Sequence, residues 1–390
     1  MKVSNSAKIM ISGGHLTPAL AVLSELKKQG FKKIIWVGSK YTQTLSKNLS
    51  PEYQILTSRN LTFVNFSAGK FWRRWTLATL FKGIFNLFLI PIGFFRALII
   101  LLKYRPDVIV SFGGYLALPL IIFARLLGIK SLTHEQTVVL GLANKIITRF
   151  SDKILISWPD SQKFFPKNKT ILTGNPLRQE VLNVTTNKYK FPNSLPVIYV
   201  TGGNQGANTI NWRLLAILPK VLQIANVLHQ TGQSTLTNDY AKALQTKKEL
   251  RKDLQNRYIV VDNVFTSEIG EILHKADLII SRAGANTITE VLALGKLVIL
   301  IPLPWSSHNE QLKNARMVAA TGLGNILEQY DGMPADLLLE KIKLGLNILK
   351  SGKDFSGKPL AASQQQAKKL IKTNASSRIV EVIIQLLEKA

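Results

Sequence analysis

The sequence of 390 residues contains no cysteine and few acidic side chains. The absence of thiols excludes disulfides, thiolate zinc sites and cysteine nucleophiles, and it is compatible with a reducing cytoplasm. Fifty lysines and arginines stand against only 23 aspartates and glutamates, which gives a formal net charge of +27. Such a chain should bind something anionic: nucleic acid, an acidic bilayer surface or a phosphorylated ligand. With 46% hydrophobic residues it has enough apolar material for two ordinary cores, which excludes disorder for most of its length.

The amino terminus lacks the long apolar stretch and small-residue cleavage site of a signal peptide, so we expect the protein to stay inside the cell. Residues 69–105 are rich in aromatic and aliphatic side chains, but Lys82, Pro91 and Arg96 interrupt them. A spanning helix needs about 20 apolar residues, so we expect this segment not to cross a membrane. It forms either a buried helix pair or an apolar patch that docks on an anionic membrane, and its many cations favour docking. These cations are Lys70, Arg73, Arg74, Lys82, Arg96, Lys103 and Arg105.

Short apolar runs rich in β-branched residues alternate with helical stretches along the chain. Continuous apolar runs of this kind are typical of parallel sheets covered on both faces. The alternation restarts after Gly174-Asn175-Pro176, which we interpret as an extended connector. We therefore expect two doubly wound, Rossmann-like α/β domains, residues 1–175 and 176–375, and a closing helix over 376–390 that packs back on the first domain. The expected strands are Lys8–Ser12, Lys33–Val37, Asp107–Phe112, Lys153–Ser157, Pro196–Thr201, Tyr258–Val261, Asp277–Ser281 and Leu297–Ile301.

Each expected domain opens with a strand, a glycine turn and a helix. The first turn contains Gly13 and Gly14, and the second runs from Gly202 to Gly206. Such turns present backbone N–H groups at the positive end of a helix, where phosphates bind, although glycines also serve close packing. NAD binding would further need an acidic residue after the second strand, and residues 37–40 supply none. We therefore expect no nicotinamide cofactor, and indeed no cofactor.

His15 follows the first glycine turn directly, so it should lie where the strands of the sheet end. A histidine in this place is either a candidate general base or a loop residue, and position alone does not decide. His134-Glu135 begins like a zinc protease motif but lacks the second histidine. The sequence also has no Asp-x-Asp pair of the kind that holds a metal-bound nucleotide sugar. We expect no metal site.

The densest group of candidate residues lies between Ala276 and Glu290. A strand should end at Ser281 and a helix should begin near residue 286, with Glu290 in its first turn. The backbone donors of this turn would face a diphosphate, and the carboxylate would face vicinal ribose hydroxyls. A capped helix whose acid offsets the helix dipole also explains Thr287 and Glu290, but it does not explain the small residues crowded into the turn.

Several motifs, taken together and in order, resemble the MurG family of peripheral membrane N-acetylglucosaminyltransferases. The resemblance covers residues 8–325, and each motif alone is modest. It implies a GT-B-type fold with two domains facing a cleft, UDP-N-acetylglucosamine held mainly by the second domain, and an undecaprenyl-diphosphate muramyl-pentapeptide acceptor at the first. The motifs are Gly13–His15 with Pro18–Leu20, Phe112–Tyr115, His134–Gln136, Gly141–Asn144, Gly174–Arg178, Gly202–Ala207, Arg282–Glu290, and Gln311 with Asn314.

The same resemblance implies roles for individual residues. Val261 would contact the uracil of the donor, and Thr137 stands where the family has an asparagine that touches the donor sugar. The residues that would bind the acceptor are Gly13, Gly14, Tyr115 and Asn144. The residues that would bind the donor are Ser12, Gly13, Gly14, Thr137, Arg178, Asn204, Val261, Ala285, Asn286, Thr287, Ile288, Thr289, Glu290 and Gln311.

The sequence departs from the family pattern near the donor. The first glycine loop is shorter than the family's, Asn204 replaces a serine at the donor phosphates, and Glu310 replaces a glutamine. Threonine at 137 offers one hydrogen-bond donor where the amide offered two donors and an acceptor.

We expect an inverting, metal-independent transferase at the cytoplasmic face of the membrane. The acceptor 4-hydroxyl would attack C1 of the donor sugar, with His15 as the general base and Glu135 as the next candidate. Arg178 and the helix start would stabilise the departing diphosphate. Two alternatives stay open: a related transferase with another lipid acceptor such as diacylglycerol, and a basic RNA-binding protein. The cations do not follow an RRM or KH pattern, so we expect no nucleic acid partner.

Overall fold

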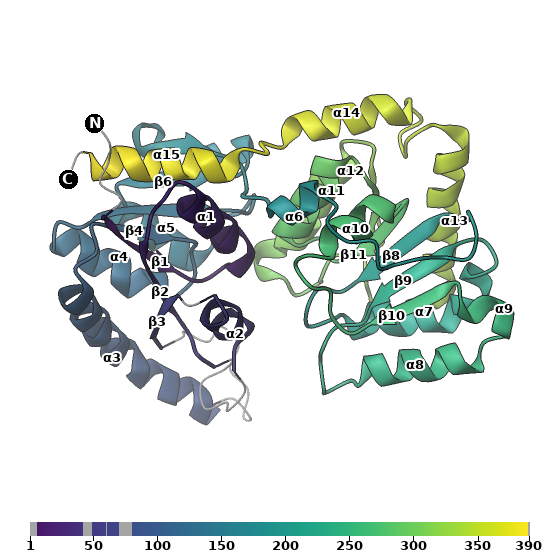
Figure 1. The fold of residues 1–390 in the computed structure, drawn as a ribbon, viewed down its shortest axis with the longest axis horizontal. Coiled ribbons are helices and arrows are strands. Elements are labelled where there is room, and N and C mark those ends of the chain that lie inside the picture. The colour runs from purple at the N-terminus through teal and green to yellow at the C-terminus, as the bar shows by residue number, and fades with distance from the viewer. Residues whose placement is uncertain (1–5, 42–48, 60, 70–79, 389–390) are drawn as a thin grey trace. The chain divides into compact units, whose positions relative to one another are not determined.

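The computed structural model describes residues 6–41, 49–59, 61–69 and 80–388, without the side chains of residues 51, 80–83 and 85. The chain forms two compact units (Figure 1). Unit 1 comprises Met1–Pro176 and Lys372–Ala390, and unit 2 comprises Leu177–Ile371. The chain thus returns to unit 1 four residues before the expected start of the closing helix.

Unit 1 is built on a seven-stranded sheet in the order β3-β2-β1-β4-β5-β6-β7, and every pair of neighbouring strands is parallel. The strands are β1 (Lys8–Ser12), β2 (Lys33–Gly38), β3 (Thr62–Asn65), β4 (Val108–Ser111), β5 (Lys130–Glu135), β6 (Lys153–Ile156) and β7 (Thr170–Leu172). The helices are α1 (Leu16–Lys28), α2 (Pro51–Thr57), α3 (Leu80–Tyr104), α4 (Ala117–Leu126), α5 (Leu142–Phe150) and α15 (Ala375–Leu387).

Alternate residues of the strands in unit 1 point into two different hydrophobic cores. Ile9 and Ile11 point into a core that includes residues of α1, α2 and α15, whereas Met10 points into a core with α3, α4 and α5. Figure 1 shows α15, in yellow, running alongside α1. Because both faces of the sheet are covered, its strands can be apolar throughout, which is why they were visible in the sequence.

Unit 2 has a second all-parallel sheet of six strands, in the order β10-β9-β8-β11-β12-β13. The strands are β8 (Val197–Thr201), β9 (Asn226–Gln230), β10 (Tyr258–Val261), β11 (Leu278–Ser281), β12 (Leu297–Leu300) and β13 (Gly324–Ile326). The helices are α6 (Gln179–Leu182), α7 (Asn208–Val221), α8 (Asp239–Glu249), α9 (Lys252–Gln255), α10 (Ile269–Lys275), α11 (Ala285–Leu294), α12 (Glu310–Ala319), α13 (Ala335–Ser351) and α14 (Leu360–Leu370). Two doubly wound parallel sheets confirm the predicted fold class.

Helix α3 corrects one prediction. We expected Lys82, Pro91 and Arg96 to interrupt the apolar segment, but α3 is one continuous helix of 25 residues that contains all three positions. Its stretch Asn86–Tyr104 has a mean hydropathy of 2.0 over 19 residues, and by length and composition alone it could cross a membrane. One side of α3 packs on unit 1, where Ala97 and Leu101 are buried.

The opposite side of α3, which we call the outer face, is apolar and open. The spacing of its residues by three or four places them on one side of the helix. Lys70, Arg73 and Arg74, predicted to flank this segment, lie outside the described residues. The outer face consists of Ile84, Leu87, Phe88, Ile92, Phe95, Ile99 and Leu102.

Candidate functional site

Both glycine turns lie where the strand order of their sheet reverses. In unit 1 the reversal falls between β1 and β4, and in unit 2 between β8 and β11. At such a point the connections leave in opposite directions and open a crevice at the carboxyl ends of the strands, where ligands of doubly wound sheets bind. The turns directly follow β1 and β8, so each unit carries its candidate residues at this point.

In unit 1 the first glycine turn touches a second glycine segment. A Cβ atom on Gly14 would come within 2.2 Å of the Gly113 carbonyl oxygen, so only glycine permits this approach. Gly113 and Gly114, which follow β4, have φ angles of +78° and +84°, a region that favours glycine. The structure therefore brings together the segments that hold Gly13, Gly14 and Tyr115. Ser12, by contrast, is buried, and its hydroxyl donates to the carbonyl of Gly13.

His15 precedes α1 as its N-cap residue and makes no side-chain capping bond. The residue is exposed to solvent, but desolvation by the protein that crowds around its imidazole lowers its pKa to about 4. The imidazole is therefore neutral near pH 7. A neutral imidazole can accept a proton, as a general base must.

Glu135, the second candidate base, is the last residue of β5, and its carboxylate accepts hydrogen bonds from neighbouring residues. Oε1 accepts from the Thr137 backbone N–H (3.1 Å) and hydroxyl (2.9 Å), and Oε2 accepts from Asn144 Nδ2 (2.6 Å). Burial raises the pKa of this carboxyl although these hydrogen bonds oppose the shift. The Asn144 amide in turn lies against Gly113. This arrangement suits a positioning residue that fixes Thr137 and Asn144 beside the glycine segment.

Sequence reasoning missed Glu52, in the first turn of α2. Its Oε1 accepts a hydrogen bond of 2.6 Å from Trp36 Nε1, and its carboxylate occupies the space that side chains at Gly13 and Gly38 would fill. Burial raises the pKa of the Tyr115 phenol, and the Glu52 carboxylate raises it further. Glu52 thus lies beside two residues assigned to the acceptor. Its partners are distant in the sequence and follow no motif, so no signal pointed to it.

Unit 2 holds a pocket of about 520 Å³ at its reversal point. The second glycine turn, from Thr201 to Ala207, forms one side, and Gly284 and Thr287 at the start of α11 form another. Gln311 also lines the pocket, and its Oε1 accepts from the Leu303 backbone N–H (3.0 Å). A glycine turn and a helix start therefore border one cavity, an arrangement that suits a phosphate-bearing ligand.

The other residues of the predicted donor segment differ in their access to solvent. Ala285, Asn286 and Thr287 are partly exposed in the first turn of α11, whereas Ile288 and Thr289 are buried. Thr289 donates its hydroxyl to the carbonyl of Ala285 one turn earlier (2.8 Å). Ile288 therefore has a packing role in this structure. Asn204 is exposed in the glycine turn.

Arg178 and Glu290, both assigned to the donor, bind each other. Arg178 Nε and Nη2 both donate to Glu290 Oε1, at 3.1 and 2.5 Å. Both side chains are largely buried, with 22% and 9% of their surfaces exposed. In this structure Arg178 therefore holds Glu290 in place, and its guanidinium is committed to that carboxylate.

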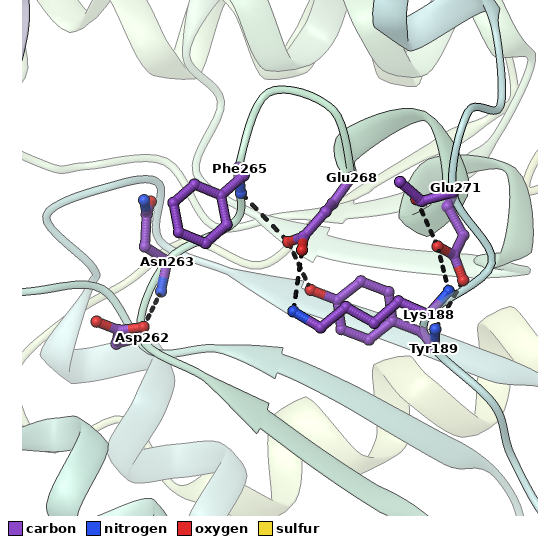
Figure 2. A network of polar contacts seen from close by, with 8 residues as sticks. Lys188, Tyr189, Asp262, Asn263, Phe265, Glu268 and Glu271 are labelled. Atoms are coloured by element: carbon purple, nitrogen blue, oxygen red, sulfur yellow. Dashed lines mark hydrogen bonds and ion pairs between the residues drawn. The ribbon is translucent and has the colours of Figure 1, made fainter. Parts of the chain in front are cut away.

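Val261 ends β10, an edge strand, and does not line the pocket. The segment after it is fixed by a polar network shown in Figure 2. Glu268 accepts from Lys188 Nζ (2.9 Å), the Tyr189 hydroxyl (2.9 Å) and the Phe265 backbone N–H (3.4 Å). The network thereby ties the chain after β10 to the chain after α6, and it leaves Phe265 64% exposed.

Glu271, in the same network, should contribute stability that depends on pH. Its buried carboxylate accepts from Lys275, Thr186 and the backbone N–H groups of Lys188 and Tyr189. Burial alone would raise its pKa, but these hydrogen bonds lower it to about 2. Because the folded pKa lies below the unfolded one, the stabilisation is complete above about pH 4.5 and is lost as the pH falls towards 2.

We therefore expect Glu271→Gln to lower the free energy of unfolding by about 3 kcal/mol at pH 7. The difference from wild type should shrink between pH 4.5 and 2, as measured by urea unfolding. Asp336→Asn is a matched control, because Asp336 pairs with Lys220 in an exposed ion pair. A difference that stays constant with pH would show that packing, and not the charge of Glu271, is responsible.

Comparisons with known proteins match both units. Residues 12–156 match the model of the glycosyltransferase family 28 N-terminal domain, and residues 197–373 match that of the C-terminal domain. A protein of Clostridium perfringens is 34% identical over 337 residues, covering 85% of this chain and 87% of its own. One of Thermoanaerobacter sp. is 32% identical over 378 residues, covering 95% and 96%. Both are named UDP-N-acetylglucosamine–N-acetylmuramyl-(pentapeptide) pyrophosphoryl-undecaprenol N-acetylglucosamine transferase.

Solved structures share the fold over nearly the whole chain. The crystal structure of Acinetobacter baumannii MurG superposes with a TM-score of 0.67 at 25% identity, covering 99% of this chain and 100% of that one. The glycosyltransferase of kitacinnamycin superposes with a TM-score of 0.69 at 15% identity, covering 98% and 99%. The second likeness concerns the fold alone.

Proposed function

This chain belongs to the MurG family within glycosyltransferase family 28, and from that premise we infer its reaction. It transfers N-acetylglucosamine from UDP-N-acetylglucosamine to N-acetylmuramyl-(pentapeptide) pyrophosphoryl-undecaprenol, the step from lipid I to lipid II in peptidoglycan synthesis. The observation that carries this conclusion is the identity of 32% with a transferase of that name over 95% of the chain.

We propose that the transfer inverts the configuration at C1 of the sugar. The 4-hydroxyl oxygen of the acceptor forms a bond to C1, the bond from C1 to the diphosphate breaks, and its electron pair leaves with UDP. His15, whose imidazole is neutral at pH 7, takes the hydroxyl proton. Backbone N–H groups of the second glycine turn and of the start of α11 hold the charge on the diphosphate without a metal ion.

Binding of the donor can be tested without acceptor. UDP should raise the melting temperature of the protein, because a ligand at 100 times its Kd adds about 2.7 kcal/mol to the stability of the folded state. The measurement is a thermal shift with UDP and UDP-N-acetylglucosamine, and CDP serves as the control nucleotide. If millimolar UDP gave no shift, the assignment of the unit 2 pocket to the donor would be wrong.

We also propose that the protein is peripheral on the cytoplasmic face of the membrane and docks through α3. The outer face presents Phe88 and Phe95, 69% and 65% exposed, beside Arg96 and Lys103. Aromatic side chains enter the lipid interface while cations meet anionic headgroups, at about 1 kcal/mol each. The buried side of α3 packs on unit 1, with Phe94 edge-to-face against Phe123 of α4, and this favours docking over spanning.

Phe88→Glu/Phe95→Glu should release the protein from vesicles that contain phosphatidylglycerol. Burying one aromatic side chain contributes about 1.5–3 kcal/mol, so the double variant should lose most vesicle binding in a sedimentation assay. Leu236→Glu/Leu370→Glu is the control, because it makes the same charge change at exposed leucines of unit 2. Equal binding by the α3 variant and wild type would refute docking through the outer face.

A further inference from the structure

Two arginines of unit 2, the buried Arg213 and the half-buried Arg282, have only neutral partners among the described residues. Arg282, which follows β11, donates from Nη1 to the Ile301 carbonyl (3.0 Å) and from Nη2 to the Thr209 hydroxyl (2.7 Å) and Gln329 Oε1 (2.9 Å). Arg213, on α7, donates to the carbonyls of Met333 (3.2 Å) and Thr209 (2.9 Å). Among the described residues, neither guanidinium forms an ion pair with a carboxylate.

This arrangement is unusual because buried charges are normally paired. Arg213 is 6% exposed, and both guanidiniums bind the same residue, Thr209, so two like charges lie close together. Desolvation, followed by the charge of Arg213, lowers the pKa of Arg282 to about 10, and Arg282 therefore stays charged at neutral pH. Without an anion nearby, the pair costs free energy in the folded state.

The pair adjoins the pocket of unit 2. Arg282 and Thr209 line it, together with the second glycine turn and the start of α11. The same pocket therefore combines a glycine turn and a helix start with positive charge that forms no ion pair with a carboxylate in the described part of the chain. Such a combination suits a ligand with more than one negative charge.

We propose that Arg282, supported by Arg213, supplies the positive charge that binds the diphosphate of the donor and stabilises UDP as it leaves. This proposal rests on the function proposed above and adds the residues that carry the charge. Arg282 acts from the wall of the pocket. Arg213 acts through Thr209 and Arg282, which makes it a positioning residue. Arg178, which the sequence favoured for this role, is held by Glu290.

The alternative is that Arg282 only ties β11 to α7 and to the chain after β13. The two roles differ in how they depend on ligand charge, so we compare uridine, UMP and UDP by titration calorimetry. Arg282→Gln should raise the Kd of UDP by about 10–100-fold, the loss expected for charge-assisted hydrogen bonds. The loss should be smaller for UMP and nearly absent for uridine. Arg282→Lys, which keeps the charge, should retain most of the UDP affinity.

Two further variants complete the test. Lys220→Gln removes a positive charge from the exposed side of α7 and should leave all three affinities unchanged. Arg213→Gln should weaken UDP more than uridine, and it serves as the second variant if Arg282→Gln does not fold. Equal losses for uridine and UDP would overturn the proposal and leave the reaction intact. Failure of the wild type to bind UDP would instead refute the proposed function.

Discussion

Replacing His15 by alanine is expected to lower kcat by about 10²–10⁴-fold, the usual contribution of a general base. The Kd of UDP-N-acetylglucosamine should change little, because the candidate donor pocket belongs to unit 2 and His15 belongs to unit 1. The measurement is steady-state kinetics with a lipid I analogue, together with donor titration of the same variant. Because the pKa of His15 is lowered to about 4 in the free protein, the acidic limb of kcat/KM should lie well below pH 6.5.

Glu135→Gln is the informative companion variant. The amide oxygen can still accept from Thr137, but the amide cannot be a base and its NH2 cannot accept from Asn144. A loss of kcat as large as that of His15→Ala would therefore favour Glu135 as the base only if acceptor binding is unchanged. An unchanged kcat in His15→Ala would remove His15 from the chemistry. A loss of kcat accompanied by an equal loss of acceptor binding would make His15 a positioning residue.

Replacing Glu290 by alanine is expected to damage both stability and donor binding. The change leaves the largely buried guanidinium of Arg178 unpaired, and breaking a buried pair in this way costs about 3–5 kcal/mol. Glu290 should also hold the ribose, because both hydrogen bonds from Arg178 reach Oε1 and leave Oε2 for a hydroxyl. Loss of a hydrogen bond to a charged group lowers affinity by about 10–100-fold.

Two controls separate these effects. Arg178→Ala/Glu290→Ala should be less destabilised than the sum of the single variants, because the pair is coupled. For the ribose, 2′-deoxy-UDP should bind the wild type more weakly than UDP does, and Glu290→Ala should not distinguish the two. Continued discrimination by the variant would show that Glu290 does not bind the ribose.

The sequence predicted those strands whose residues are apolar throughout. β11 and β12 are continuous apolar runs buried on both faces. The predicted ends of both strands lie within one residue of the observed ends. β9 was missed because Asn226, His229 and Gln230 are polar. His229 is nevertheless buried, with Nδ1 2.7 Å from the Tyr258 hydroxyl and Nε2 3.0 Å from Asn211 Oδ1. Side chains that are distant in the sequence make the polar strand possible.

In the candidate site, too, local sequence patterns predicted the elements but not the contacts between distant residues. Glycine turns followed by helices could be located from local spacing alone, and the structure places them at the reversal points of the two sheets. Partners could not be predicted in this way. The pairing of Arg178 with Glu290 joins residues 112 positions apart, and Arg282 reaches Thr209 over 73 positions. Such contacts depend on how the helices pack, which no local pattern specifies.

The most direct test of the account is a transfer assay with radiolabelled UDP-N-acetylglucosamine and a short-chain lipid I analogue, with diacylglycerol as the competing acceptor. We expect label on the muramyl 4-hydroxyl, with the new glycosidic bond in the β configuration when the product is analysed by NMR. We also expect no label on diacylglycerol. Transfer to diacylglycerol alone, or no transfer to the lipid I analogue by a protein that binds UDP, would contradict the account.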